Sequence, residues 1–194
     1  MPDRMDSIRD FVKVVHPLSD EVWQEFSAAW EPFTARRKEI LTQAGEREKY
    51  LYFVTEGVQR VYYADAEGRE ATLVFTYAPS FGGVLDAFMQ QTPSRYYYET
   101  LTPSTFLRTP AEKMFSLMKR HQELEVWARK GLSGAIAGVL ERLAEVQSFT
   151  AEERFRSLLK RSPHILQLVP HKYLANYLAI DATNFSKLIN SVRI

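Results

Sequence analysis

Cysteine is absent from the 194 residues of the chain. The sequence therefore has no disulfide, no thiol nucleophile and no Cys-ligated zinc. Long hydrophobic runs are also missing, because the longest weakly polar stretch, Gly131 to Leu140, is far shorter than the roughly 20 residues of a membrane span. The segment from Met1 to Asp10 is charged and lacks the apolar stretch of a signal peptide. We therefore expect a cytoplasmic protein that does not enter a membrane.

An excess of charge of either sign is lacking as well. The 25 Lys and Arg oppose 24 Asp and Glu, which gives a formal net charge of +1. For the whole chain, this balance argues against a nucleic-acid partner. The balance is uneven along the chain, however. Residues 151–194 carry seven basic and three acidic side chains, whereas residues 1–150 carry eighteen and twenty-one. The C-terminal segment alone has the charge expected of a nucleic-acid-binding part.

Catalytic and metal-binding motifs are missing too. The sequence contains no Ser-His-Asp arrangement and no phosphate-binding loop, so we expect a protein that is not an enzyme. The four histidines show no ligand spacing with one another or with carboxylates, so we expect no metal site. They are His16, His121, His164 and His171.

The composition that remains, with 45% hydrophobic and 25% charged residues, is typical of a globular protein. Near the N-terminus, Ser19 and the acidic residues after it predict a helix whose apolar residues reach Trp30, and Pro32 ends it. From Phe33 to about Leu107, short β-rich runs alternate with turn signals, which predicts an antiparallel barrel or sandwich. These runs are Ile40–Leu41, Tyr50–Thr55, Val58–Tyr63, Ala71–Tyr77 and Tyr96–Leu101.

Helices follow the β-rich region. The sequences Thr109-Pro-Ala-Glu112 and Thr150-Ala-Glu-Glu153 both fit the capping box that opens a helix. Between them, apolar residues recur at intervals of 4, 3, 4 and 3, which is typical of a coiled-coil stripe. The stripe either packs within its own domain or forms a dimer interface, and its narrowness favours the dimer. Its residues are Leu132, Ile136, Val139, Leu143 and Val146.

The C-terminal segment has the pattern of a helix-turn-helix. Apolar and small residues from Tyr173 to Leu178 form a first helix, Ala179-Ile180 a turn, and Asp181 caps a second helix that Phe185 buries. An ordinary helical hairpin has the same pattern, but the basic charge of the segment favours double-stranded DNA as the partner. The side chains left to contact phosphates and base edges are Lys172, Thr183, Asn184, Ser186, Lys187 and Asn190.

In this order, a β-rich domain, a long helix and a terminal helix-turn-helix resemble the Crp/Fnr family of transcription regulators. The stretches that carry the resemblance are Tyr50–Tyr62, Ala66–Phe75, Phe81–Leu85 and Pro93–Arg95. The resemblance implies an α+β fold: an antiparallel, jelly-roll-like β-roll of the cyclic-nucleotide-binding type, a long dimerisation helix and an all-α helix-turn-helix. The corresponding segments are residues 1–108, 109–149 and 150–194. It also implies a homodimer, with an effector that is sensed in the β-roll and relayed through the long helix.

In the family, a phosphate-binding cassette of the form Phe-Gly-Glu-Leu, followed by Arg-Ser/Thr-Ala, holds a cyclic nucleotide. Here Gly83 stands at the glutamate position, and Tyr96 and Tyr97 follow Arg95 where small residues are expected. No cofactor is certain, and cyclic AMP is the least favoured effector. The alternatives are another small anionic or aromatic effector anchored by Arg95, and a pocket without ligand. The candidate effector-binding residues are Gly82, Gly83, Val84, Leu85, Ser94, Arg95 and Tyr96.

Two further departures concern the DNA-binding end. The wing that family members place beside the helix-turn-helix is shortened or absent, and Ala182, Thr183 and Lys187 replace an Arg-Glu-x-x-x-Arg reading pattern. The absence of cysteine excludes the iron–sulfur sensing of the Fnr branch. We therefore expect a DNA-binding regulator of modest specificity. The alternative is a small-molecule-binding or protein-interaction module whose vestigial helix-turn-helix reads no DNA.

Overall fold

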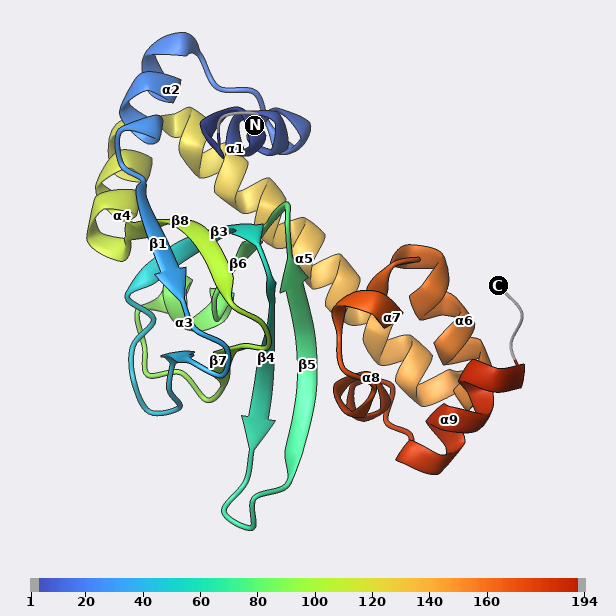
Figure 1. Cartoon of the computed structure of the whole chain (residues 1–194). Helices are drawn as coiled ribbons and strands as arrows, with labels where there is room; N and C mark the ends of the chain where they lie inside the picture. The colour runs from blue at the N-terminus through green and yellow to red at the C-terminus, as the bar shows by residue number, and fades with distance from the viewer. Residues whose placement is uncertain (1–3, 192–194) are drawn as a thin grey trace.

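The computed structural model describes residues 4–191 and contains two four-stranded antiparallel sheets that form a β-roll (Figure 1). In the first sheet the strand order is β1 (Glu31–Ala35), β8 (Ser104–Pro110), β3 (Tyr50–Glu56) and β6 (Ser80–Gly82). In the second sheet the order is β2 (Ile40–Thr42), β7 (Tyr97–Thr100), β4 (Val58–Ala64) and β5 (Glu70–Tyr77). With helices before and after the roll, the α+β class predicted from the sequence is confirmed.

The five expected β-runs are all strands, but the sequence did not indicate β1, β6 or β8. Strand β1 contains Pro32, which an edge strand tolerates because one side of it has no hydrogen-bonded neighbour. The helix expected to reach Trp30 is shorter, since α2 spans Asp20–Ser27. Trp30 instead lies buried between the first sheet and its flanking helices, against Phe26 and Phe81.

One apolar core lies between the first sheet and the helices that flank it. These helices are α1 (Arg4–Val15), α2, α3 (Leu85–Gln90), α4 (Ala111–Arg120) and the first turns of α5 (Gln122–Ser148). Phe26, Phe53 and Trp127 lie near its centre. A second core fills the inside of the roll with Tyr52, Tyr98 and Phe106. Neighbouring residues of β7 point to opposite faces: Tyr98 points inward, while Tyr97 stacks on Tyr62 outside, with ring centroids 5.0 Å apart.

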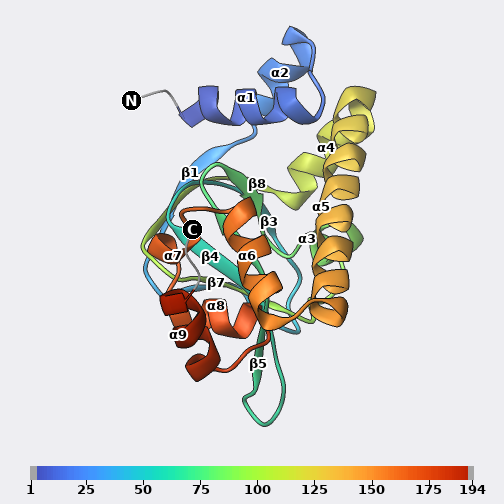
Figure 2. The same ribbon diagram turned by 90° about the vertical axis from the view of Figure 1, so that its right-hand side faces the viewer.

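The C-terminal helices pack directly against the second sheet (Figures 1 and 2). They are α6 (Ala151–Arg161), α7 (Ile165–Leu168), α8 (His171–Tyr177) and α9 (Ala182–Ser191). Their core around Phe155, Leu174 and Phe185 also includes Val58 and Leu101 of the roll. In the part of the chain that the structure describes after Pro110, all regular elements are helical. None of the helices within residues 4–191 has the length and apolar character needed to cross a membrane.

The two predicted capping boxes have different outcomes. Thr150 is confirmed, because its hydroxyl accepts from Glu153 N while the Glu153 carboxylate accepts from Thr150 N. Thr109 was predicted wrongly. It belongs to β8, where it pairs with Leu51, and helix α4 begins only at Ala111. Extended backbone and strand pairing point the Thr109 side chain inward, so its hydroxyl is buried and has no hydrogen-bond partner.

This difference predicts opposite responses to substitution. Thr150→Ala removes a helix cap and should lower the free energy of unfolding by about 1 kcal/mol. Thr109→Val removes only a buried hydroxyl that has no partner, so it should leave that free energy unchanged or raise it. Urea unfolding followed by circular dichroism measures both. A larger loss for Thr109→Val than for Thr150→Ala would contradict this assignment.

Candidate functional site

Helices α8 and α9 form the helix-turn-helix that the sequence indicated. The chain leaves α8 through Ala179, whose φ of 55° lies in the left-handed region, and Ile180 N donates to Ala175 O at 3.0 Å. Asp181 then caps α9, because its Oδ1 accepts from Asn184 N at 2.8 Å. The predicted turn and the predicted cap are both confirmed.

One face of α9 is polar and exposed, while Phe185 anchors the opposite face against Phe155 with ring centroids 5.6 Å apart. Two exposed side chains already have local partners: Asn184 Nδ2 donates to Asp181 Oδ2 at 2.6 Å, and Ser186 Oγ donates to Ala182 O at 2.9 Å. Within the described residues, the other three make no side-chain hydrogen bond. They are Thr183, Lys187 and Asn190. Lys172 at the start of α8 is also exposed, with its ammonium 4.7 Å from the Tyr173 ring.

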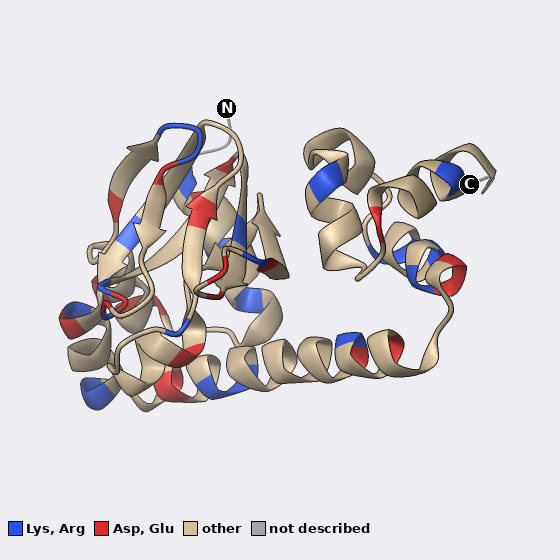
Figure 3. Ribbon diagram, turned by 90° about the horizontal axis from the view of Figure 1, so that it is seen from below, with Lys and Arg blue, Asp and Glu red and all other residues tan. Residues whose placement is uncertain are grey.

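Lys and Arg residues lie along the C-terminal helices (Figure 3), and two of the arginines bind groups at the end of α5. Arg154 donates to the carbonyls of Val146 and Phe149 at the end of α5, both at 3.2 Å. Arg161 pairs with the buried Glu145 of α5, with Nη2 2.9 Å from Oε2. These arginines join α5 to α6, so the surplus of positive charge overstates what remains for a phosphate backbone. Arg193, which that count includes, lies outside the described residues.

The second half of α5 exposes an apolar stripe. Ile136, Val139 and Leu143 are 60, 57 and 49% exposed, and Val146 is 37% exposed. Leu132 is half-buried. Two further exposed apolar residues, Leu140 and Phe149, continue the stripe and were not recognised from the heptad spacing. The alternative of a helix that buries this stripe in its own domain does not agree with these exposures.

The segment that matches the phosphate-binding cassette lies where β6 leads into α3. A Cβ on Gly82 would overlap the hydroxyl of the fully buried Tyr98, which itself lies 3.0 Å from Thr76 Oγ1. Gly83 has a φ of +117°, a conformation that L side chains rarely adopt. The glutamate of the family pattern would therefore be strained at this position. Val84 is buried, and Leu85 begins α3.

The carboxylate of Glu48 accepts a hydrogen bond from the backbone of this segment, at Val84 N. Glu48, only 1% exposed, accepts from Val84 N at 2.8 Å and from Thr42 Oγ1 at 2.6 Å. Burial raises the pKa of this carboxyl, although the two hydrogen bonds oppose the shift. Nothing in the local sequence marks Glu48, because its partner Val84 lies 36 residues away.

The three candidate residues around Arg95 differ in their surroundings. Ser94 is buried, and its hydroxyl donates to Tyr96 O at 2.8 Å and accepts from Tyr96 N at 3.0 Å. Tyr96 is half-buried and packs against the interior of the roll. Arg95 is exposed, and within the described residues it forms no ion pair. The Arg95 side chain therefore lies on the surface of the roll.

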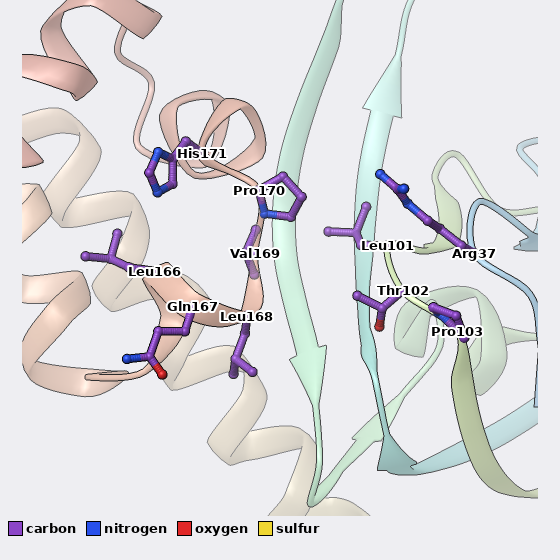
Figure 4. A pocket seen from close by; sticks show the side chains of 10 residues that line it. All are labelled: Arg37, Leu101, Thr102, Pro103, Leu166, Gln167, Leu168, Val169, Pro170 and His171. Carbon is purple, nitrogen blue, oxygen red and sulfur yellow. The ribbon is translucent and has the colours of Figure 1, made fainter.

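Two cavities lie at the junction between the roll and the C-terminal helices. The first, of about 470 Å³, lies between Arg37 and Leu101–Pro103 on one side and Leu166–His171 on the other (Figure 4). The second, of about 270 Å³, is lined by Val58, Tyr77 and Leu168 among others. Neither cavity includes a cassette residue.

Comparison with known protein families agrees with the β-roll described above. Residues 32–121 match the family described as "Cyclic nucleotide-binding domain". No curated protein sequence matches the chain. The match covers 90 of the 194 residues, so the β-roll is similar to cyclic nucleotide-binding domains. In this chain, Glu48 and Tyr98 contact the segment that corresponds to the cassette.

Solved structures extend the likeness beyond the roll. FixK2 from Bradyrhizobium japonicum superposes with a TM-score of 0.76 at 15% identity, covering 83% of each chain. A protein of Eubacterium rectale described as a transcriptional regulator of the crp/fnr family gives 0.71 at 17% identity, over 89% of this chain and 82% of that one. The c-di-GMP responsive regulator CLP of Xanthomonas campestris gives 0.65 at 14% identity, over 89% and 90%. The resemblance to Crp/Fnr regulators is confirmed, and the chain has their fold.

The occupied cassette leads to a ligand-binding prediction. Cyclic AMP should leave the melting temperature of the wild-type protein unchanged, because Glu48 already holds Val84 N and Tyr98 fills the space below Gly82. A thermal-shift titration with cyclic AMP and with inorganic phosphate measures this, with Arg95→Ala as the matched control. A rise in the wild type that is lost in Arg95→Ala would instead support an anionic effector held by Arg95.

Proposed function

We propose that this protein is a dimeric, DNA-binding regulator of transcription of the Crp/Fnr type. The observation that carries the proposal is the exposed polar face of α9, which follows α8 through a capped turn and is anchored from behind by Phe185. A recognition helix needs this combination of a buried apolar side and a free polar side to enter a major groove. The free groups are Thr183, Lys187 and Asn190, with Lys172 for the phosphates.

Dimerisation through α5 is the second part of the proposal. The stripe from Ile136 to Phe149 groups exposed apolar side chains along the second half of α5 and just beyond it, and a contiguous exposed apolar patch marks an interaction site. A second copy of the same helix is the partner that the repeat of intervals 4 and 3 fits, because equivalent positions meet along a shared axis. A dimer also gives two recognition helices, which compensates for the small number of strong base readers in each.

The sequence-based hypothesis also includes an effector that binds in the roll and whose signal passes through α5 to α9. The contacts of Glu48 with Val84 and of Tyr98 beneath Gly82 favour the alternative of a pocket without ligand. The region from Gly82 to Leu85 would then have a structural role, and Arg95 would be a surface residue.

The proposed DNA binding predicts a strong dependence on salt. Wild-type protein should retain genomic fragments that contain a two-fold symmetric site, and its affinity should fall steeply between 50 and 200 mM salt as counterions return to the phosphates. Lys187→Ala should reduce the slope of log affinity against log salt concentration by about 1 for each subunit, because one phosphate contact is lost. Fluorescence anisotropy at several salt concentrations measures this. Absence of retention at 50 mM salt would favour the module with a vestigial helix-turn-helix.

The proposed dimer predicts that one charge can separate the subunits. Ile136→Lys places an ammonium in the centre of the stripe and should produce a folded monomer. Val14→Lys is the matched control, because Val14 is an 88% exposed apolar residue on α1, outside the stripe. Light scattering after size exclusion measures the masses. A dimer in Ile136→Lys, or a monomer in Val14→Lys alone, would contradict the α5 interface.

A further inference from the structure

Strand β5 has an open edge, and a side chain of the helix-turn-helix covers it. β5 is the outer strand of the second sheet, so one side of its backbone has no neighbouring strand. Asn176 of α8 lies against that side: its Oδ1 accepts from Thr72 N at 2.6 Å, and its Nδ2 donates to Glu70 O at 2.7 Å. The carboxamide thus supplies the donor and the acceptor that the peptide of another strand would supply.

A second contact, one turn earlier on α8, involves Tyr173. Its ring lies 4.3 Å from the guanidinium of Arg60 and 4.5 Å from the ammonium of Lys38, and Lys38 Nζ also donates to its hydroxyl. Both cations pair with the buried Glu99, Arg60 Nε at 2.8 Å and Lys38 Nζ at 3.0 Å. Arg60 pairs with Glu70 at 2.7 Å as well. Tyr173 therefore contacts an ion network that is built into the second sheet.

Further contacts follow along β5, one between rings and one between hydroxyls. Phe75 packs on Tyr177 with ring centroids 5.2 Å apart, and the hydroxyls of Tyr77 and Ser162 lie 2.6 Å apart. From the other side, Arg142 of α5 donates to Tyr177 O. Helix α8 is thus held between β5 and α5, and α9 follows it through a turn of only a few residues (Figure 1).

We propose that Tyr173 and Asn176, with their partners Lys38, Arg60, Glu70 and Thr72, form an interdomain latch that holds the helix-turn-helix in its DNA-reading orientation without a bound effector. The proposal rests on the proposed function. Two observations support the stated direction. The latch leaves the polar face of α9 exposed, and all its groups belong to the protein itself.

The occupied cassette agrees with this role. In this chain a carboxylate of the roll, Glu48, takes the backbone donor of Val84. The latch in turn connects the roll to α8 directly, through β5. A ligand is therefore not needed to complete either contact.

The latch acts through the geometry of a pair. Two recognition helices bind a two-fold symmetric site together only if their separation is fixed, since each then meets its half-site at a high effective concentration. Release of α8 from β5 would let α9 move, so part of that gain would be lost to ordering. Binding of one recognition helix to a single half-site would be unaffected, because no latch residue lies on the reading face.

The test compares Asn176→Ala with Asn190→Ala on two DNA duplexes, the two-fold symmetric site recovered with the wild type and one isolated half of it. Asn176→Ala should weaken binding to the full site by about tenfold or more and leave the half-site affinity unchanged. Asn190→Ala, the same chemical change on the reading face, should weaken both. Hydrogen exchange at Thr72 N should accelerate only in Asn176→Ala, because this amide loses its partner.

Several results would overturn the latch. Equal full-site affinity of Asn176→Ala and wild type, or a tighter Asn176→Ala, contradicts it, and the latter would mean that docking masks the DNA-binding state. A tenfold gain in wild-type affinity on addition of cyclic AMP contradicts its independence of effector. Tyr173→Phe, which keeps the ring, is a milder variant and should shift the full-site affinity in the same direction. A wild type that binds no DNA removes the proposed function itself, whereas wild-type binding with an unaffected Asn176→Ala removes the latch alone.

Discussion

The buried guanidinium of Arg60 ties together three strands of the second sheet. It projects from β4 and is almost fully buried, so its charge must be compensated within the protein. Glu99 on β7 and Glu70 on β5 supply this compensation from the two neighbouring strands. Burial opposes the charged form, but these hydrogen bonds more than offset it, and the pKa of Arg60 is raised. Because the same guanidinium lies under Tyr173, the pairing that fixes the strands also fixes where α8 docks. The position of the helix-turn-helix on the roll is thus tied to the charge compensation of Arg60.

The inside of the roll must fill the space next to the end of β6. A sheet that curls around a cassette leaves a space at the end of β6, and a protein without ligand must fill that space or leave it to water. Tyr98 and Tyr52 fill it with aromatic rings, and Glu48 satisfies Val84 N, a backbone donor that would otherwise be buried without a partner. The polar groups that accompany the tyrosines are hydrogen-bonded, as shown by the contact of Tyr98 with Thr76. Side chains of the protein thus fill this part of the roll, which supports the proposed pocket without ligand.

Local patterns predicted the parts of the structure that depend on neighbours in sequence. The turn at Ala179, the caps at Thr150 and Asp181 and the five β-runs are of this kind, since each depends on residues a few positions apart. The parts that could not be predicted depend on distant partners. The residues next to Thr109 fit a helix cap, but pairing with β3 places Thr109 in the sheet. Similarly, no neighbour in sequence indicates that Glu48 is buried, because its hydrogen-bond partner Val84 is distant along the chain. Asn176 is the extreme case: 104 residues separate it from Thr72, and its side chain resembles any polar group on a helix.

The contacts between α5 and α6 connect the long helix to the C-terminal helices. Glu145 is buried at the end of α5 and is held by Arg161 of α6, while Arg154 of α6 binds the last carbonyls of α5. These bonds join the end of α5 to α6, and loss of the Arg161 pair would remove a guanidinium from the buried Glu145 carboxylate. The apolar stripe lies on the same stretch of α5. In the proposed dimer, the crossing of two α5 helices and the docking of α8 on β5 would together set the separation of the two α9 helices. Under the proposed latch, both sets of contacts come from the protein itself and would need no effector.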